Sequence, residues 1–315
     1  MTVASAGTIR VDRADSLYTD LANSIEFAAT GEHLTAGGLC SATLIHSNWV
    51  LTAAHCVDAN GNGSIADDVA GNHTFEVAGS GPVTASNIYV PSSWDGDINN
   101  GSDIALLELS SPITSVTPAT IYRGNSELTA DVTTVGYGKT GNGQTGSDLA
   151  AGTRRAGNNI IDSYVFFPGG EQVFASTIDA ADRTGLVWDF DSPVGDPQHV
   201  NTNVFGSALP VDLEYQIAPG DSGGGSYIQI AGSWFLAGVT SGDANTFNYP
   251  GALEPGNRDT YGDISLVTRV SSYQTFIDSF VPTNGAAVPE PQSFVLCGLF
   301  SGLALLRRKR NVTNA

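Results

Sequence analysis

Three short segments of this sequence carry residues that can perform nucleophilic catalysis together. They are the His55 of a Thr-Ala-Ala-His-Cys segment, the Asp103 of Asp-Ile-Ala-Leu-Leu and the Ser222 of Pro-Gly-Asp-Ser-Gly-Gly-Gly. A serine hydroxyl needs a base that accepts its proton, and a histidine base needs an anion that fixes its tautomer. The three residues therefore form a candidate base, anion and nucleophile, in the chain order His, Asp, Ser.

These motifs and their order resemble those of the trypsin/chymotrypsin family of serine endopeptidases, over about residues 25–280. The resemblance implies that Ser222 attacks the peptide bond, that His55 acts as general base and then general acid, and that Asp103 steadies the histidine. It also implies an oxyanion hole made by the backbone N–H groups of Gly220 and Ser222. The implied reaction is peptide hydrolysis through an acyl-enzyme.

The same resemblance assigns residues to the pocket for the side chain that precedes the scissile bond. Gln216 lies six residues before Ser222, at the position that forms the base of this pocket in the family. A neutral amide offers no counter-charge, so we expect no strong preference for Arg or Lys. An inward-turned Asp243 or Glu214 is the alternative, since either would restore a negative charge. The expected pocket wall consists of Thr240, Ser241 and Gly242.

Asp221, directly before the nucleophile, marks a departure from the family pattern. In the family this carboxylate is buried against a new N-terminal amine that cleavage creates. The amine usually belongs to an Ile-Val-Gly-Gly segment, which this sequence lacks, and Ile9 is a poor substitute. The departure leaves open a second function, that of a catalytically inactive homologue that binds protein or polysaccharide at the cell surface.

The cysteines indicate the compartment. Cys40 and Cys56 match two positions that a disulfide joins in the family, next to the histidine. That pairing implies an oxidising, exported setting. Cys297 lies in an apolar segment near the C-terminus and has no evident partner.

Short runs rich in Val, Ile, Thr and Tyr alternate with Gly, Asn, Asp and Ser clusters along this chain of 315 residues. This pattern is typical of an all-β fold. Together with the resemblance it predicts two packed antiparallel six-stranded β-barrels, a short C-terminal helix at 271–280 and an irregular stretch at 139–203. We expect a leader remnant at 1–7, the N-terminal barrel at 8–120, the C-terminal barrel and helix at 121–281, and a linker and tail at 282–315.

The charge balance is strongly acidic, with 32 acidic and 13 basic residues and a net charge of −19. Such a chain is repelled by nucleic acid, so we expect no nucleic-acid partner. We expect a monomer that acts on protein or peptide substrates and needs no cofactor. A structural calcium ion near Asp58, Asn60 and Asn62 is an alternative to an ordinary polar loop, because the segment resembles the start of an EF-hand loop.

The C-terminal tail has three parts, which are Pro289-Glu290-Pro291, an uncharged run at 292–306 and a basic cluster at 307–310. This layout resembles a bacterial PEP-CTERM sorting tail, which an exosortase-like enzyme recognises and cuts. A plain membrane anchor is the alternative, although the apolar run is shorter than the roughly 20 residues of a comfortable span. We expect transient anchoring in the inner membrane of a Gram-negative-type bacterium, followed by release to the cell surface or the medium.

Overall fold

The computed structural model describes residues 7–168, 173–175, 183–196, 203–206, 209–243 and 259–282. The fold is mostly β, and its two α-helices among these residues are α1 (Asp15–Ala22) and α3 (Gln274–Asp278). None of the described helices has the length and apolar character needed to cross a bilayer. The expected sorting tail and Cys297 lie outside the described residues.

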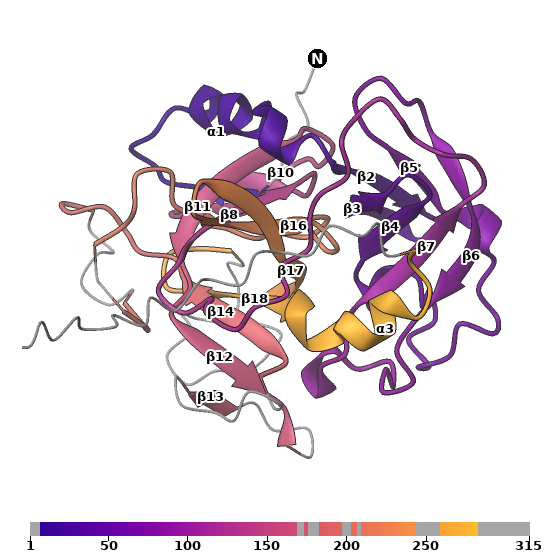
Figure 1. Ribbon diagram of the computed structural model, residues 1–315. Helices are drawn as coiled ribbons and strands as arrows, with labels where there is room; N and C mark the ends of the chain where they lie inside the picture. The colour runs from indigo at the N-terminus through magenta and orange to yellow at the C-terminus, as the bar shows by residue number, and fades with distance from the viewer. Residues whose placement is uncertain are drawn as a thin grey trace, which may run out of the picture. The chain divides into compact units, whose positions relative to one another are not determined.

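The N-terminal half forms the closed six-stranded barrel that the sequence predicts (Figure 1). Around the barrel the strands follow the order β2 (Thr30–Thr35), β3 (Gly38–His46), β4 (Trp49–Thr52), β7 (Ala105–Leu109), β6 (Val83–Tyr89) and β5 (Thr74–Glu76). Their inward side chains make one apolar core that includes Leu44, Val50, Phe75 and Leu107. Closure removes the free edges of the sheet and leaves the strand ends to carry functional residues.

The second half is built differently from the barrel that we expected. An eight-stranded sheet has the order β11 (Arg155–Ile160), β8 (Asp131–Gly136), β16 (Gly225–Ile230), β17 (Ser233–Asp243), β18 (Ile264–Arg269), β14 (Gly185–Asp189), β12 (Ser163–Phe166) and β13 (Val173–Ala175). A smaller sheet has the order β10 (Gly146–Leu149), β9 (Thr140–Asn142), β1 (Gly7–Ile9) and β15 (Tyr215–Gln216). A second closed barrel is therefore not confirmed among the described strands.

The two sheets stay separate because of the way in which strand β15 is paired. Strand β1 runs between β9 and β15 and pairs with both, so the edge of β15 is already occupied on that side. On its other side, Glu214, the residue before β15, makes one isolated bridge with Asn158 of β11. A single bridge does not continue a ladder, and the sheets remain distinct.

Strands β9 to β14 and helix α1 were not predicted, because polar side chains hide their periodicity. In β11, Arg155 is buried and forms a two-pronged ion pair with Asp15 of α1, with both N–O distances at 2.6 Å. Asn159 is also buried and donates to the carbonyl of Asp189 at 2.7 Å. A buried polar group is tolerated when a partner satisfies it, and such a partner cannot be read from local sequence.

The expected C-terminal helix is present as a 3-10 turn (Val270–Tyr273) that continues into α3. Beyond α3, the ring of Phe280 stacks on Tyr89 of β6, with 4.1 Å between their centroids. Arg123 forms an ion pair with Asp278 at 2.5 Å. The end of the described chain therefore ties the second half to the N-terminal barrel.

The predicted disulfide between Cys40 and Cys56 is confirmed, and it joins β3 to the short turn that follows β4. Replacing both cysteines by serine should lower the free energy of unfolding by about 3 kcal/mol, because the unfolded chain gains freedom. Urea denaturation of the double variant against wild type measures this loss. An unchanged midpoint and slope would show that the bond contributes nothing to stability.

Buried carboxyl groups near the junction of the two sheets give the fold a pH dependence. Burial, together with the charges of the neighbouring carboxylates of Asp189 and Asp162, raises the pKa of Asp191 to about 8. Burial also raises the pKa of Glu214 to about 9. These groups hold protons in the folded state that the unfolded chain releases near pH 4, so their contribution is complete below that pH and is lost as the pH rises through 8 and 9.

Thermal melts should therefore show a Tm that falls between pH 5 and pH 9. Asp191→Asn removes one of the groups that must ionise, so we expect the variant to melt a few degrees above wild type at pH 9 and close to it at pH 5. Asp20→Asn, at an exposed carboxyl of α1, serves as the matched control. A parallel pH dependence in wild type and Asp191→Asn would contradict this assignment.

Candidate active site

His55 and Asp103 meet at the end of the N-terminal barrel. His55 lies in a 3-10 turn (Ala54–Cys56) directly after β4, and Asp103 lies two residues before β7, the neighbour of β4 in the barrel. His55 Nδ1 is 2.7 Å from Asp103 Oδ2, and the backbone N–H of His55 donates to Asp103 Oδ1 at 2.9 Å. Adjacent strands thus bring together residues that are 48 positions apart.

The two groups shift each other's pKa. Burial alone would lower the pKa of His55, but the charge of Asp103 and its hydrogen bond outweigh burial and raise it above 6.5. Burial alone would raise the pKa of Asp103, and the hydrogen bonds and charge of its neighbours lower it instead. Asp103 is 1% exposed and His55 30%, so the anion is enclosed while the imidazole still reaches the surface. This is the environment that a general base requires.

The second half of the chain completes the surroundings of Asp103. Ser241 of β17 donates its hydroxyl to Asp103 Oδ2 at 2.6 Å, and Thr268 of β18 donates to the Asp103 carbonyl at 2.8 Å. The register of β17 against β18 shifts between Thr240 and Gly242, so Ser241 falls at an irregularity in the strand. The hydroxyl of Ser241 is thus bonded to Asp103, and the place of Ser241 on the pocket wall stays a prediction.

The turn that carries Ser222 has an unusual backbone. Gly220 has φ +101° and Gly223 has φ +83°, values that favour glycine. A Cβ at Gly223 would also lie 2.2 Å from the carbonyl oxygen of Ser41, so no other residue fits there. Ser41 of β3 fixes the turn, since its N–H donates to the Ser222 carbonyl at 2.8 Å and its hydroxyl to the Gly220 carbonyl at 2.9 Å.

This arrangement leaves two backbone donors available. No hydrogen bond within the described residues uses the N–H of Gly220 or of Ser222. Their carbonyls are held by Ser41, which restricts the orientation of the peptide planes. Two fixed N–H groups beside a serine hydroxyl are what stabilisation of a tetrahedral oxyanion requires.

Ser222 and His55 both lie against the disulfide. Cys56 Sγ is 3.8 Å from His55 Nε2 and 3.7 Å from the carbonyl oxygen of Ser222. In the described part of the chain no hydrogen bond joins the Ser222 hydroxyl to His55 Nε2. Such bonds are often long without substrate and shorten in the reacting complex.

Gln216 of β15 is fully buried in the second half. Its Oε1 accepts a hydrogen bond from Ser265 of β18 at 2.7 Å, while its Nε2 has no partner among the described residues. Glu214 does not turn toward it, because both Glu214 oxygens accept backbone N–H groups, those of Asp191 and Val211, each at 2.6 Å. An amide donor therefore remains unpaired near the position expected for the pocket base.

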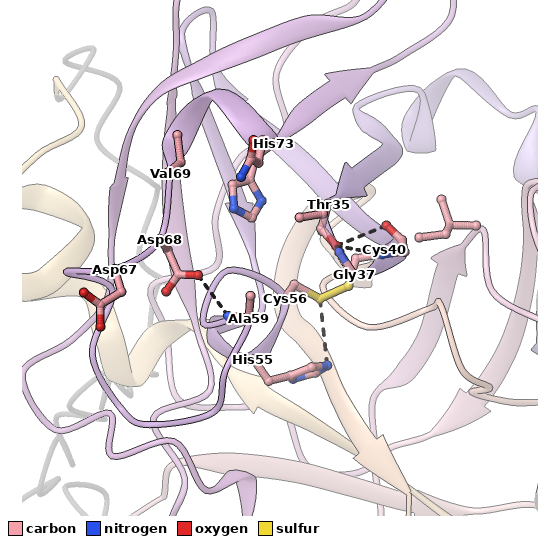
Figure 2. Close-up of a pocket in the computed structure, with 14 residues that line it drawn as sticks. Thr35, Gly37, Cys40, His55, Cys56, Ala59, Asp67, Asp68, Val69 and His73 are labelled. Carbon is pink, nitrogen blue, oxygen red and sulfur yellow. Dashed lines mark hydrogen bonds between the residues drawn. A yellow bond between two sulfur atoms is a disulfide. The ribbon is translucent and has the colours of Figure 1, made fainter.

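A cavity of about 400 Å³ lies next to His55 in the N-terminal half, lined by residues from the segments 35–40, 55–59 and 67–73 (Figure 2). His55 and the Cys40–Cys56 disulfide line one end of this cavity, and Asp67 and Asp68 line the other.

Oxygens of the loop after His55 accept hydrogen bonds from the protein itself. Asp58 accepts N–H groups from Asn62, Gly63 and the Trp94 ring, at 3.2, 2.8 and 3.0 Å. Asn60 accepts from the N–H of Asn62 at 3.0 Å. Among the described residues the one group of three close potential metal ligands is Cys40, His55 and Cys56, and the disulfide occupies both sulfur atoms. Calcium binding at this loop stays a prediction.

Comparisons with known proteins agree with this geometry. The Trypsin family profile matches residues 22–165, which include His55 and Asp103. Protein C, a vitamin K-dependent protein, is 26% identical over 259 residues in the rat, covering 80% of this chain and 48% of the relative. The mouse protein gives 26% over 255 residues, covering 79% and 47%. Human chymotrypsin-like elastase family member 1 is 40% identical over 78 residues, covering 24% and 29%.

The chain spans about half the length of the protein C relatives that it matches. The chain is similar to trypsin-type serine peptidases over part of its length.

The hydroxyl of Ser241 should affect turnover although it lies away from the nucleophile. Ser241→Ala removes a hydrogen bond to a buried carboxylate, so we expect the pKa of Asp103 to rise and kcat/KM to fall about tenfold. Ser233→Ala, at the exposed start of the same strand, is the control. Equal kcat/KM values for wild type and Ser241→Ala would remove Ser241 from the site.

Proposed function

We propose that the protein is an exported serine endopeptidase in which Ser222, His55 and Asp103 form the catalytic triad. The observation that carries the proposal is the enclosed Asp103–His55 pair, with a 2.7 Å hydrogen bond, beside a serine turn whose two N–H groups are available. Homology to serine peptidases supports the same reaction.

The reaction follows from these positions. The Ser222 hydroxyl attacks the carbonyl carbon while His55 Nε2 takes its proton, and the N–H groups of Gly220 and Ser222 hold the resulting oxyanion. The tetrahedral intermediate collapses when protonated His55 passes the proton to the leaving amine. A water molecule, deprotonated by His55, then hydrolyses the ester and restores Ser222.

Export and sorting belong to the same proposal. The Cys40–Cys56 disulfide supports an oxidising compartment, because such bonds persist outside the cytosol. The Pro-Glu-Pro, apolar and basic segments of the tail support transient membrane anchoring and removal by an exosortase-like enzyme. The peptidase would then act on proteins or peptides at the surface of a bacterium or outside it.

Replacing the nucleophile tests the central residue. Ser222→Ala should lower peptide turnover on the order of a millionfold and abolish labelling by a fluorophosphonate probe, which reacts only with an activated serine. Ser16→Ala, at an exposed serine of α1, should behave as wild type. A wild-type protein that is folded but never labelled would instead indicate the inactive binding homologue.

A second prediction concerns the residue before the cut. The unpaired Nε2 of buried Gln216 can donate to a carbonyl or hydroxyl, and an Arg or Lys would lose hydration there without an anion. Matched peptides that differ only at this residue should be cleaved faster with Gln or Leu than with Arg. If Arg is faster by about a hundredfold, or about 2.7 kcal/mol of transition-state binding, the pocket is negative and this assignment is wrong.

A further inference from the structure

Asp221 lies in the sequence between Gly220 and Ser222, whose N–H groups form the proposed oxyanion hole. Its carboxyl is fully buried. Its Oδ1 accepts the N–H of Gly138 at 2.8 Å. Its Oδ2 accepts the N–H of Ala218 at 2.9 Å and the hydroxyl of Tyr215 at 3.0 Å. Among the described residues, Tyr215 is the one side chain that donates to it.

The ring of Tyr215 has a fixed position. Tyr215 is 1% exposed, and its strand β15 pairs with β1, which places Ile9 opposite it. Two glycines approach the ring so closely that neither could carry a side chain, because a Cβ would lie 1.9 Å from Tyr215 Cζ at Gly7 and 2.2 Å from Tyr215 Cβ at Gly157. The sheet therefore holds the hydroxyl in place.

We propose that Tyr215 is a positioning residue, which holds Asp221 as an anion and so keeps the Gly220–Ser222 turn in its catalytic shape in the intact chain. The inference rests on the proposed peptidase function. The bond from Tyr215 would hold the turn in a sequence that lacks an Ile-Val-Gly-Gly segment. Three donors of the chain itself satisfy the carboxylate, so no newly formed terminal amine is required.

The electrostatics of the pocket support this role. Burial is the largest effect on Asp221 and raises its pKa. The hydrogen bonds from Gly138, Ala218 and Tyr215 and the charge of Arg155 lower it, and the net result is a pKa of about 6. Arg155 lies on β11 and is itself paired with Asp15. Burial and the neighbouring carboxylates of Asp221 and Asp259 raise the pKa of Tyr215 well above 10, so its hydroxyl remains a donor.

Protonation of Asp221 should weaken the hydrogen bonds that hold the turn. A protonated Asp221 becomes a donor and can no longer accept all three hydrogen bonds, so the turn should loosen as the pH falls through 6. Removing the Tyr215 hydroxyl takes away one bond to the anion. The pKa of Asp221 should then rise. The acid limb of activity, to which the protonation of His55 contributes in wild type and variant alike, should become steeper and move to higher pH.

The test is the pH profile of the rate of fluorophosphonate labelling in the full chain. For Tyr215→Phe we expect the midpoint of the acid limb to rise by about one pH unit, with rates approaching wild type at higher pH. Tyr227→Phe is the matched control, since this buried tyrosine bonds to Thr30 at 2.7 Å and does not donate to Asp221. A Tyr215→Phe midpoint equal to that of wild type would overturn the proposal.

A second measurement applies if Tyr215→Phe lacks a cooperative melt. Wild-type chain whose N-terminus has been verified by mass spectrometry should be labelled before any cleavage. Labelling that appears only after a new N-terminus has formed would overturn the proposal and leave the peptidase function intact. A wild type that is never labelled, before or after cleavage, would overturn the proposed function and this inference with it.

Discussion

Burial of the Asp103 carboxylate is the constraint on which the candidate site depends. An enclosed charge is costly unless donors surround it, and here they come from the turn after β4 and from β17. Strand β18 adds a bond to the Asp103 carbonyl. The positions of these donors depend on how the turn after β4 packs against strands β17 and β18. The imidazole is consequently oriented by contacts from both halves of the molecule.

The serine turn is likewise held by hydrogen bonds from both halves of the molecule. Ser41 of the N-terminal barrel holds the carbonyls of Gly220 and Ser222, and Asp221 anchors the turn from within the second half. The disulfide lies against both His55 and Ser222, so its loss would disturb the barrel and the site together. Stability and the geometry of the candidate site thus both depend on a small region near Cys56.

The sequence predicted those parts of the site that local motifs specify, and it failed where tertiary contacts decide. Glycines around Ser222, apolar strands and the Cys40–Cys56 pair leave clear local signals. The strand irregularity that turns Ser241 toward Asp103 has none, because it arises from pairing between β17 and β18. Strand β11 was not predicted for a similar reason, since its buried Arg155 pairs with Asp15 of α1, 140 residues earlier in the chain. The N-terminal strand β1, which joins β9 to β15 in the smaller sheet, likewise leaves no local signal in the sequence.

The central claim is that Asp103 holds the Nδ1 proton of His55 in an enclosed, charge-assisted hydrogen bond. Proton NMR of the protein with labelled histidine measures this directly, because such a proton resonates far downfield and exchanges slowly with water. We predict one downfield signal that couples to His55 Nδ1 in wild type and is absent in Asp103→Asn. No downfield signal in the folded wild type, or the same signal in both proteins, would contradict the account.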